Sequence, residues 1–199
     1  WTRFTILRHF PDQRNGAGVE PQYHDCDENW LFSAGHGEVW LDDERFPITP
    51  NTLVYTPMGV VHHFQMYANG ENNALVTRLE RHKRPIHILV EEAGPPEKTV
   101  PGFVIAGNLN TGPIPNPGTR CPFTELRMIT LAPGEMIEQT QLPNNEHWLV
   151  LEGVLHLTIG ESEFELYKGD VALLRAGLVR RLGSSSGGRV LFVRERGQL

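Results

Sequence analysis

The sequence ENWLFSAG at residues 28–35 returns as EHWLVLEG at residues 146–153, an offset of 118 residues from Glu28 to Glu146. The same offset aligns Gly59 with Gly177 without a gap. Self-similarity at a fixed spacing indicates that one structural unit occurs more than once in a chain. We therefore expect two copies of a single unit, each of roughly 80 residues, within the usual size range of a domain.

The segment between the two copies is rich in proline. Residues 85–119 contain seven of the 15 prolines, so we predict an N-terminal unit at 1–84, a linker at 85–119 and a C-terminal unit at 120–199. Long structureless loops are uncommon in compact proteins. The apolar stretches at 86–90 and 103–106 are therefore expected to be extended segments that complete the sheets.

Each copy contains short runs of β-branched and aromatic residues, which are typical of strands. In the first copy they fall at 30–32, 38–41, 53–55 and 60–66, and in the second at 149–151, 154–159 and 171–174. Turn residues separate them at close intervals, as in sandwiches and barrels. The helical pattern at 74–84 also fits a strand followed by a charged turn, and we predict the strand. The prediction is an all-β fold.

The composition limits the classes of partner. The chain has 199 residues and a net charge of −6, which gives no field to attract phosphate backbones or anionic lipid. Its apolar runs are far shorter than a membrane span. Two cysteines are too few for a disulfide framework, so a reducing compartment is expected, and residues 1–10 show no export signal. We expect a cytoplasmic protein that binds neither nucleic acid nor membrane.

Residues that commonly bind metals stand close together in the first copy. Gln22 and His24 are two apart on an expected strand and so project from the same face, and Glu28 and His62 would join them from neighbouring strands. Two imidazoles and one carboxylate with open positions are the arrangement of non-haem Fe(II) enzymes. Gln22 would add a neutral amide oxygen or leave its place to water. We predict one divalent transition metal, with Fe(II) favoured over Zn(II), Ni(II) and Mn(II).

These positions resemble the two signature motifs of the cupin superfamily, His-x-His-x3-Glu-x6-Gly and Gly-x5-Pro-x-Gly-x2-His. The motif positions hold Gln22, His24, Glu28 and Gly35, then Asn51, Pro57, Gly59 and His62. Gln22 departs from the motif histidine and Asn51 from the motif glycine. The resemblance implies a bicupin of the quercetin dioxygenase-like kind, with two cupin-type barrels in tandem, each a double-stranded β-helix or jelly roll.

The second copy has lost most of the ligand positions of that motif. They hold Thr140, Leu142, Glu146 and Arg180. A leucine offers no donor and an arginine repels a cation, so this barrel is expected to be structural. An anion site formed by Arg175, Arg180 and Arg181 is an alternative, since guanidinium groups bind carboxylate and phosphate.

Other residues of the first copy are candidates for contact with a substrate. Trp30 and Phe32 share the strand parity of Glu28, and Phe64 and Met66 share that of His62, so these four are expected to form an apolar pocket wall. Such a pocket favours a small apolar or aromatic molecule. Glu28 and Tyr55 are the predicted catalytic residues; Tyr55, like Tyr23, would transfer a proton or anchor the substrate.

Three functions are compatible with these residues. The first is a metal-dependent dioxygenase or other oxygenase that acts on a small organic molecule. The second is a non-redox isomerase, cyclase or lyase with a sugar or polyketide-like substrate, since a bound ion also acts as a Lewis acid. The third is a non-catalytic module that binds a small ligand. Exposed sheet edges also make a homodimer an expectation.

Overall fold

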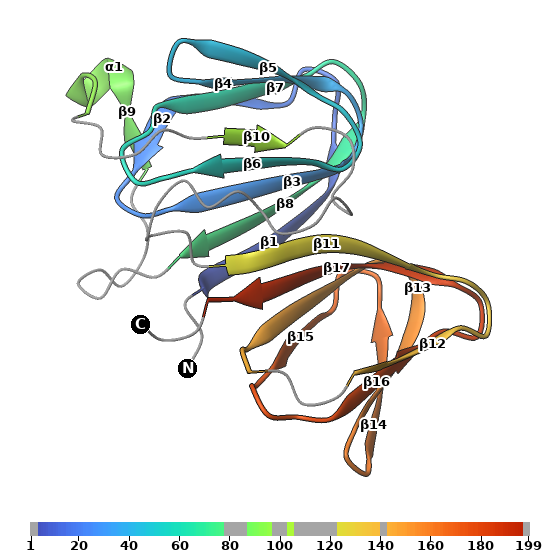
Figure 1. Cartoon of the computed structure of the whole chain (residues 1–199). Helices are drawn as coiled ribbons and strands as arrows, with labels where there is room; N and C mark the ends of the chain where they lie inside the picture. Colours follow the sequence, from blue (N-terminus) through green and yellow to red (C-terminus); the bar gives the residue numbers. More distant parts are fainter. Residues whose placement is uncertain (1–3, 78–86, 97–102, 106–122, 140–142, 197–199) are drawn as a thin grey trace. The chain divides into compact units, whose positions relative to one another are not determined.

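The computed structural model describes residues 4–77, 87–96, 103–105, 123–139 and 143–196. The chain divides into two compact units, the first formed by Trp1–Leu109 with Pro115–Pro122 and the second by Asn110–Ile114 with Phe123–Leu199. Among the described residues, the helix α1 (Val90–Ala93) is four residues long and every other regular element is a strand (Figure 1). The all-β prediction is confirmed. The predicted boundaries at 84 and 119 stay predictions.

The first unit consists of two five-stranded sheets that lie in separate layers (Figure 1). One sheet has the order β1-β8-β3-β6-β10, with the strands β1 (Phe4–Gln13), β8 (Gly70–Thr77), β3 (Glu28–Ala34), β6 (Thr52–Thr56) and β10 (Phe103–Ile105). The other has the order β5-β4-β7-β2-β9, with β5 (Glu44–Ile48), β4 (Gly37–Leu41), β7 (His62–Met66), β2 (Gly18–His24) and β9 (His87–Leu89).

Apolar side chains on the facing surfaces of these sheets form the core of the first unit. Alternate residues of a strand point to the same face, and Trp30, Phe32, Phe64 and Met66 belong to one buried cluster with Val54. Leu31 and Leu53, one position away, are also buried but lie outside that cluster. β3 is therefore covered on both faces, with only Ala34 partly exposed.

The second unit contains strands at the equivalent positions. They are β11 (Phe123–Leu131), β12 (Met136–Gln139), β13 (Glu146–Ile159), β14 (Ser162–Tyr167), β15 (Val171–Leu174), β16 (Arg180–Gly183) and β17 (Gly188–Glu195). The order is β11-β17-β13-β16-β12, and β14 and β15 also pair with β13. The first half of β13 pairs with β15 and β17, and the second half with β14 and β16.

The sequence offset is also the offset of the strand registers. Glu28 pairs with Thr56 in the first unit and Glu146 with Leu174 in the second. Gly18 pairs with Gln65, and Met136 with Gly183. In both comparisons the residue numbers of the two paired residues differ by 118 between the units, so the sequence repeat is also a repeat in strand pairing.

A glycine at one repeated position lies where the chain changes its pairing partners: Gly35 stands between β3 and β4, which belong to different sheets, and Gly153 lies inside β13. Gly35 and Gly153 have φ angles of 92° and 81°, in the left-handed region that glycine adopts without steric cost. A Cβ atom on Gly35 would lie 2.6 Å from the Cα of Gly70, and one on Gly153 would lie 2.3 Å from the carbonyl oxygen of Gly187. Both positions therefore need glycine for conformation and for space.

The two extended segments expected between the copies correspond to β9 and β10. β9 pairs with β2 and β10 pairs with β6, so both extend sheets of the first unit. β9 and β10 are the end strands of the two sheets, so residues from outside the repeated sequence become part of the first unit. No helix among the described residues is long and apolar enough to cross a membrane.

Candidate metal centre

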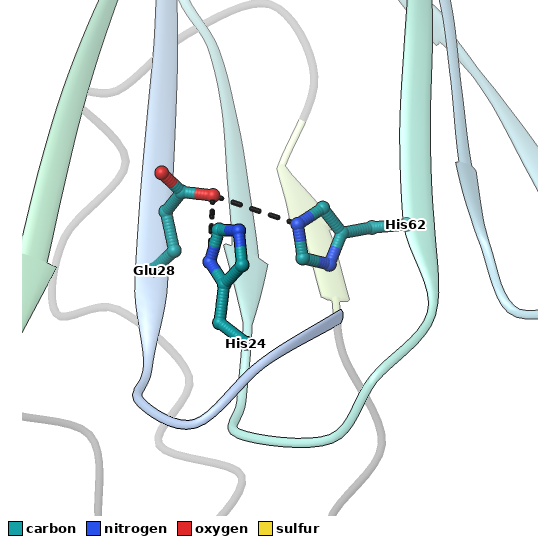
Figure 2. Close-up of side chains that lie close together, drawn as sticks. All are labelled: His24, Glu28 and His62. Carbon is teal, nitrogen blue, oxygen red and sulfur yellow. Dashed lines mark ion pairs between the residues drawn. The ribbon is translucent and has the colours of Figure 1, made fainter. Parts of the chain in front are cut away.

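His24, Glu28 and His62 converge inside the first unit (Figure 2). His24 ends β2 and His62 begins β7, which are neighbours in one sheet, while Glu28 begins β3 in the other sheet. One ligand atom from each residue lies within 4.8 Å of the other two. All three residues are at most 6% exposed. The predicted set of two imidazoles and one carboxylate is thus gathered in one buried place.

The hydrogen bonding of His62 orients it for a cation. Its Nδ1 lies 2.8 Å from the carbonyl oxygen of Val60 and must donate to it, because a carbonyl only accepts. Its Nε2 faces Oε2 of Glu28 at 3.5 Å. A backbone carbonyl that fixes the tautomer is the usual support of a metal-binding histidine. The space between Nε2 and the carboxylate is therefore suited to a cation.

The charge state of the other two residues also suits a metal. Burial lowers the pKa of His24 from 6.5 to about 4, so its ring is neutral at neutral pH, although Glu28 opposes this shift. Burial by itself would raise the pKa of Glu28, but its interactions with His62 and His24 outweigh that effect and lower the pKa. A neutral imidazole and an ionised carboxylate are the forms that coordinate metals.

Several buried polar atoms of His24, Glu28 and His62 lack a hydrogen-bond partner in the described part of the chain. Both ring nitrogens of His24, Nε2 of His62 and Oε2 of Glu28 are buried and have no hydrogen-bond partner among the described residues. Oε2 of Glu28 lies 3.2 Å from Nδ1 of His24. Buried polar atoms are nearly always satisfied. A divalent cation could be coordinated by one nitrogen or oxygen atom from each of the three residues at once, so these residues fit such an ion.

Hydrogen bonds connect the two loops next to these ligands. The backbone N–H of Gly59 donates to the carbonyl of His24 over 3.1 Å, and that of Met58 donates to Oδ1 of Asp27 over 2.8 Å. Gly59 has a φ angle of 84°, which explains the glycine in the motif. These bonds join the turn before His62 to the loop between His24 and Glu28. The three ligands are therefore positioned by one bonded assembly.

Gln22 lies beside the cluster and is bonded to a histidine that the sequence analysis did not single out. Its Oε1 lies 3.1 Å from Nδ1 of His87 on β9, and the rings of His87 and His24 are 4.4 Å apart. The amide oxygen of Gln22 is therefore engaged by His87, and its predicted role as a metal ligand stays a prediction. The segment that contains His87 was expected to be extended, but its pairing with β2 had no local sequence signal.

The four residues predicted to form a pocket wall are packed together in the core instead. Trp30 lies edge-to-face against Phe64 at 5.0 Å, and Phe32 against Phe64 at 5.2 Å. Phe32 and Met66 are fully buried within this cluster. Trp30 contacts the ring of His62 at 5.0 Å. The shared strand parity was correctly inferred, but Phe32 and Met66 fill the interior, and Trp30 forms the apolar edge of the centre.

Tyr55 lies on the other face of its strand, away from the cluster. Its neighbour Val54 is in the core with Trp30, so Tyr55 points the opposite way. Its hydroxyl donates to Oδ2 of Asp27 over 3.2 Å. The predicted catalytic role therefore has no geometric support, and the contact indicates that Tyr55 holds the loop between His24 and Glu28. Tyr23 likewise alternates with Gln22 and His24 on β2.

An ion pair stands at the corresponding place in the second unit. Glu146 and Arg180 occupy the positions of Glu28 and His62, are both fully buried, and form an ion pair. The same carboxylate accepts a bond of 3.1 Å from Nε1 of Trp148 and lies 3.3 Å from Arg194. Thr140 and Leu142 lie outside the described residues. Since Arg180 already has Glu146 as its counterion, the proposed anion site there has no support.

Comparison with known proteins identifies the fold. Residues 127–193 match the family model described as the cupin domain. That match falls on the second unit, where Arg180 replaces a ligand. No curated protein sequence matches the chain.

Several solved structures share the fold over almost the whole chain. A structure of oxalate decarboxylase has a TM-score of 0.70 at 16% identity, covering 94% of this chain and 67% of its own. Another is described with Mn(II) centres in the Bacillus subtilis enzyme. The salicylate 1,2-dioxygenase of Pseudaminobacter salicylatoxidans has a TM-score of 0.58 at 10% identity, covering 95% and 69%.

A vicilin from Corylus avellana is similar to the same extent, with a TM-score of 0.64 at 10% identity and coverage of 95% and 73%. At such identities the likeness shows the fold alone. Residues 127–193 thus match the cupin domain model, and the chain as a whole shares the all-β fold of these solved structures.

Proposed function

We propose that the protein is a metal-dependent cupin enzyme that acts on a small organic substrate, with one divalent transition metal held by His24, Glu28 and His62. The observation that carries the proposal is the buried grouping of these three residues with unsatisfied ligand atoms. Three protein ligands leave coordination positions for substrate, water or O2, as in the two-histidine, one-carboxylate centres of non-haem iron enzymes.

The net charge of the centre favours an anionic substrate. The three ligands contribute one negative charge, from Glu28, so a divalent ion leaves an excess positive charge in a buried place. A substrate oxygen that carries or develops negative charge would neutralise it. Oxalate decarboxylase and salicylate 1,2-dioxygenase, which share the fold, are named for small organic acids. We propose a substrate of this class, with Fe(II) favoured and Mn(II), Ni(II) or Zn(II) as the other ions.

When bound, the ion would act as a Lewis acid toward a substrate oxygen and, as Fe(II), would also supply redox chemistry with O2. The protein contributes orientation and exclusion of water. The carbonyl of Val60 fixes the ring of His62, the bond from Gly59 to His24 holds the two loops together, and Trp30 shields one edge of the His62 ring.

The arrangement of the whole chain is also part of the proposal. Equivalent registers at an offset of 118 residues support two cupin-type barrels in tandem, a bicupin related to quercetin dioxygenases. In this arrangement the first barrel holds the metal, and in the second the Arg180–Glu146 pair takes its place. A cytoplasmic location and a homodimer are further proposals, which rest on the low cysteine content and on the sheet edges.

Two alternatives rest on specific observations. A non-redox lyase, isomerase or cyclase would use the same ligands, and the name of oxalate decarboxylase denotes such a reaction on a similar fold. A non-catalytic binding module is the other alternative, since the name vicilin denotes no enzymatic activity.

Binding of nitric oxide to the Fe(II)-loaded protein tests the proposal. Nitric oxide occupies an open position on Fe(II) and gives a half-integer-spin EPR signal, which a fully ligated ion does not give. We expect this signal in the wild type and in the control His63→Gln, and its loss in His62→Gln. A small organic acid that changes the signal would identify the substrate class. Absence of the signal in the wild type, after anaerobic loading, would contradict the oxygenase.

Metal content after loading separates the alternatives. Selective retention of Zn(II) or Ni(II) with oxygen-independent turnover would favour the non-redox enzyme. Ligand binding that is equally strong in the wild type and in His62→Gln, with no turnover, would favour the binding module.

A further inference from the structure

His87 lies on the strand that closes the edge of the sheet next to the metal centre. β9 runs antiparallel to β2, and His87 pairs directly with His24. Residues that face each other across two strands project from the same side of the sheet. His87 therefore points to the side on which His24 contributes to the centre. The centroids of the two rings are 4.4 Å apart, whereas those of His24 and His62 are 4.8 Å apart.

The hydrogen bond to Gln22 prepares His87 for coordination in the same way that Val60 prepares His62. The amide oxygen of Gln22 can only accept, so Nδ1 of His87, 3.1 Å away, is the donor. Nε2 is then the atom that carries the lone pair. A metal-binding histidine usually donates its other N–H to a carbonyl or carboxylate. His62 and His87 share this feature, with Val60 and Gln22 as the respective acceptors.

We propose that His87 supplies a third imidazole to the metal, as a fourth protein ligand, and that Gln22 orients His87 without itself binding the ion. The proposal rests on the proposed function, because it concerns the same ion. Gln22 is almost fully buried, with 5% exposure, and it occupies a position at which the cupin motif has a histidine. The histidine missing from that position is thus replaced by one from another part of the chain.

Coordination requires His87 to move from its place in the structure. Its ligand atoms are not within the group formed by His24, Glu28 and His62. Unlike those three residues, His87 is exposed, so its ring can turn with little loss of packing.

Spectroscopy of the copper-loaded protein counts the imidazoles directly. We would load the 199-residue protein with one equivalent of Cu(II) and record electron spin echo envelope modulation, in which each coordinated imidazole adds to the modulation depth. The account predicts three imidazoles in the wild type and two in His87→Gln. The matched control is His63→Gln, on β7 beside His62, because His63 stacks on Trp40 at 4.5 Å; it should keep three.

The dissociation constant for Ni(II) is the second measurement. We expect it to rise at least tenfold in His87→Gln and about tenfold in Gln22→Ala, which removes the orienting bond. Circular dichroism and thermal unfolding of the metal-free variants establish that both are folded. Two imidazoles in the wild type, with the count and the Ni(II) affinity unchanged in His87→Gln, would overturn this inference while leaving the proposed function intact. A wild type that binds neither metal would overturn both.

Discussion

The ion pair between Arg180 and Glu146 makes the stability of the second unit a quantitative prediction. Both side chains are fully buried, and removal of one partner of a buried pair costs about 3–5 kcal/mol because the other charge is left uncompensated. In Arg180→Met, Glu146 keeps Nε1 of Trp148 at 3.1 Å and Arg194 at 3.3 Å. We therefore expect Arg180→Met to lower the free energy of unfolding by an amount at the lower end of this range, about 3 kcal/mol.

Removal of the other partner, in Glu146→Gln, should lower the free energy of unfolding further. In Glu146→Gln the buried guanidinium of Arg180 keeps the carbonyl of Leu178, at 2.9 Å, and the ring of Trp148, neither of which carries a negative charge. We expect a loss of about 4–5 kcal/mol. Replacement of both partners, in Glu146→Leu with Arg180→Met, should lower the free energy of unfolding by only about 1–3 kcal/mol, because no charge is then left buried but Nε1 of Trp148 loses its acceptor.

The assay is urea unfolding at neutral pH, with hydrogen exchange of peptides from β13 and β17 to assign the loss to the second unit. Arg181→Met is the matched control. Arg181 pairs with Glu138 at 3.0 Å with both side chains more than half exposed, so its removal should cost less than about 1 kcal/mol. Equal losses of unfolding free energy in Arg180→Met and Arg181→Met would show that burial does not set the cost of removing an arginine, and a double variant no more stable than Glu146→Gln would show that the uncompensated charge does not.

Three further predictions concern the first unit. Asn51 has a φ angle of 66°, so Asn51→Ala should lower the free energy of unfolding by about 1 kcal/mol while Asn51→Gly, which restores the motif residue, should not; urea unfolding of both variants measures this. In the metal-free protein the pKa of His24 is about 4 instead of 6.5, so between these values the unfolded chain binds more protons and stability increases with pH. The increase is about 3 kcal/mol; urea unfolding at a series of pH values should show it in the wild type and not in His24→Gln, and an equal slope in both would contradict it. Tyr55→Phe removes the bond to Asp27 and should cost about 1 kcal/mol with no change in metal stoichiometry; loss of the metal would assign Tyr55 to the centre itself.

The repeat made much of the fold predictable from the sequence. Strand registers are non-local and have no local sequence signal, but two copies at one offset show which residues must be equivalent, and Glu28 and Glu146 pair with equivalent partners. The grouping of His24 with Glu28 and His62 was predictable for the same reason that the motif is recognisable: strand alternation limits which side chains share a face.

The remaining features depend on tertiary contacts. His87 was missed because its position beside His24 follows from the pairing of β9 with β2, and nothing within residues 86–90 indicates that partner. The sequence did not show which face of its strand Tyr55 occupies. Val54 packs in the core with Trp30, so the adjacent Tyr55 points to the opposite face. Phe32 and Met66 have the parity of the ligands, but parity alone does not distinguish a pocket wall from a filled interior. The distinction depends on packing between the two sheets.

Metal analysis of the purified protein measures whether His24, Glu28 and His62 hold one divalent ion. Wild type, His62→Ala and the control His63→Ala would be loaded separately with Fe(II), Mn(II), Ni(II) and Zn(II), desalted, and measured by inductively coupled plasma mass spectrometry. The account predicts about one equivalent per chain in the wild type and in His63→Ala, as a single site requires, and none in His62→Ala. A wild type that retains no metal, or a His62→Ala variant that retains as much as the wild type, would contradict it.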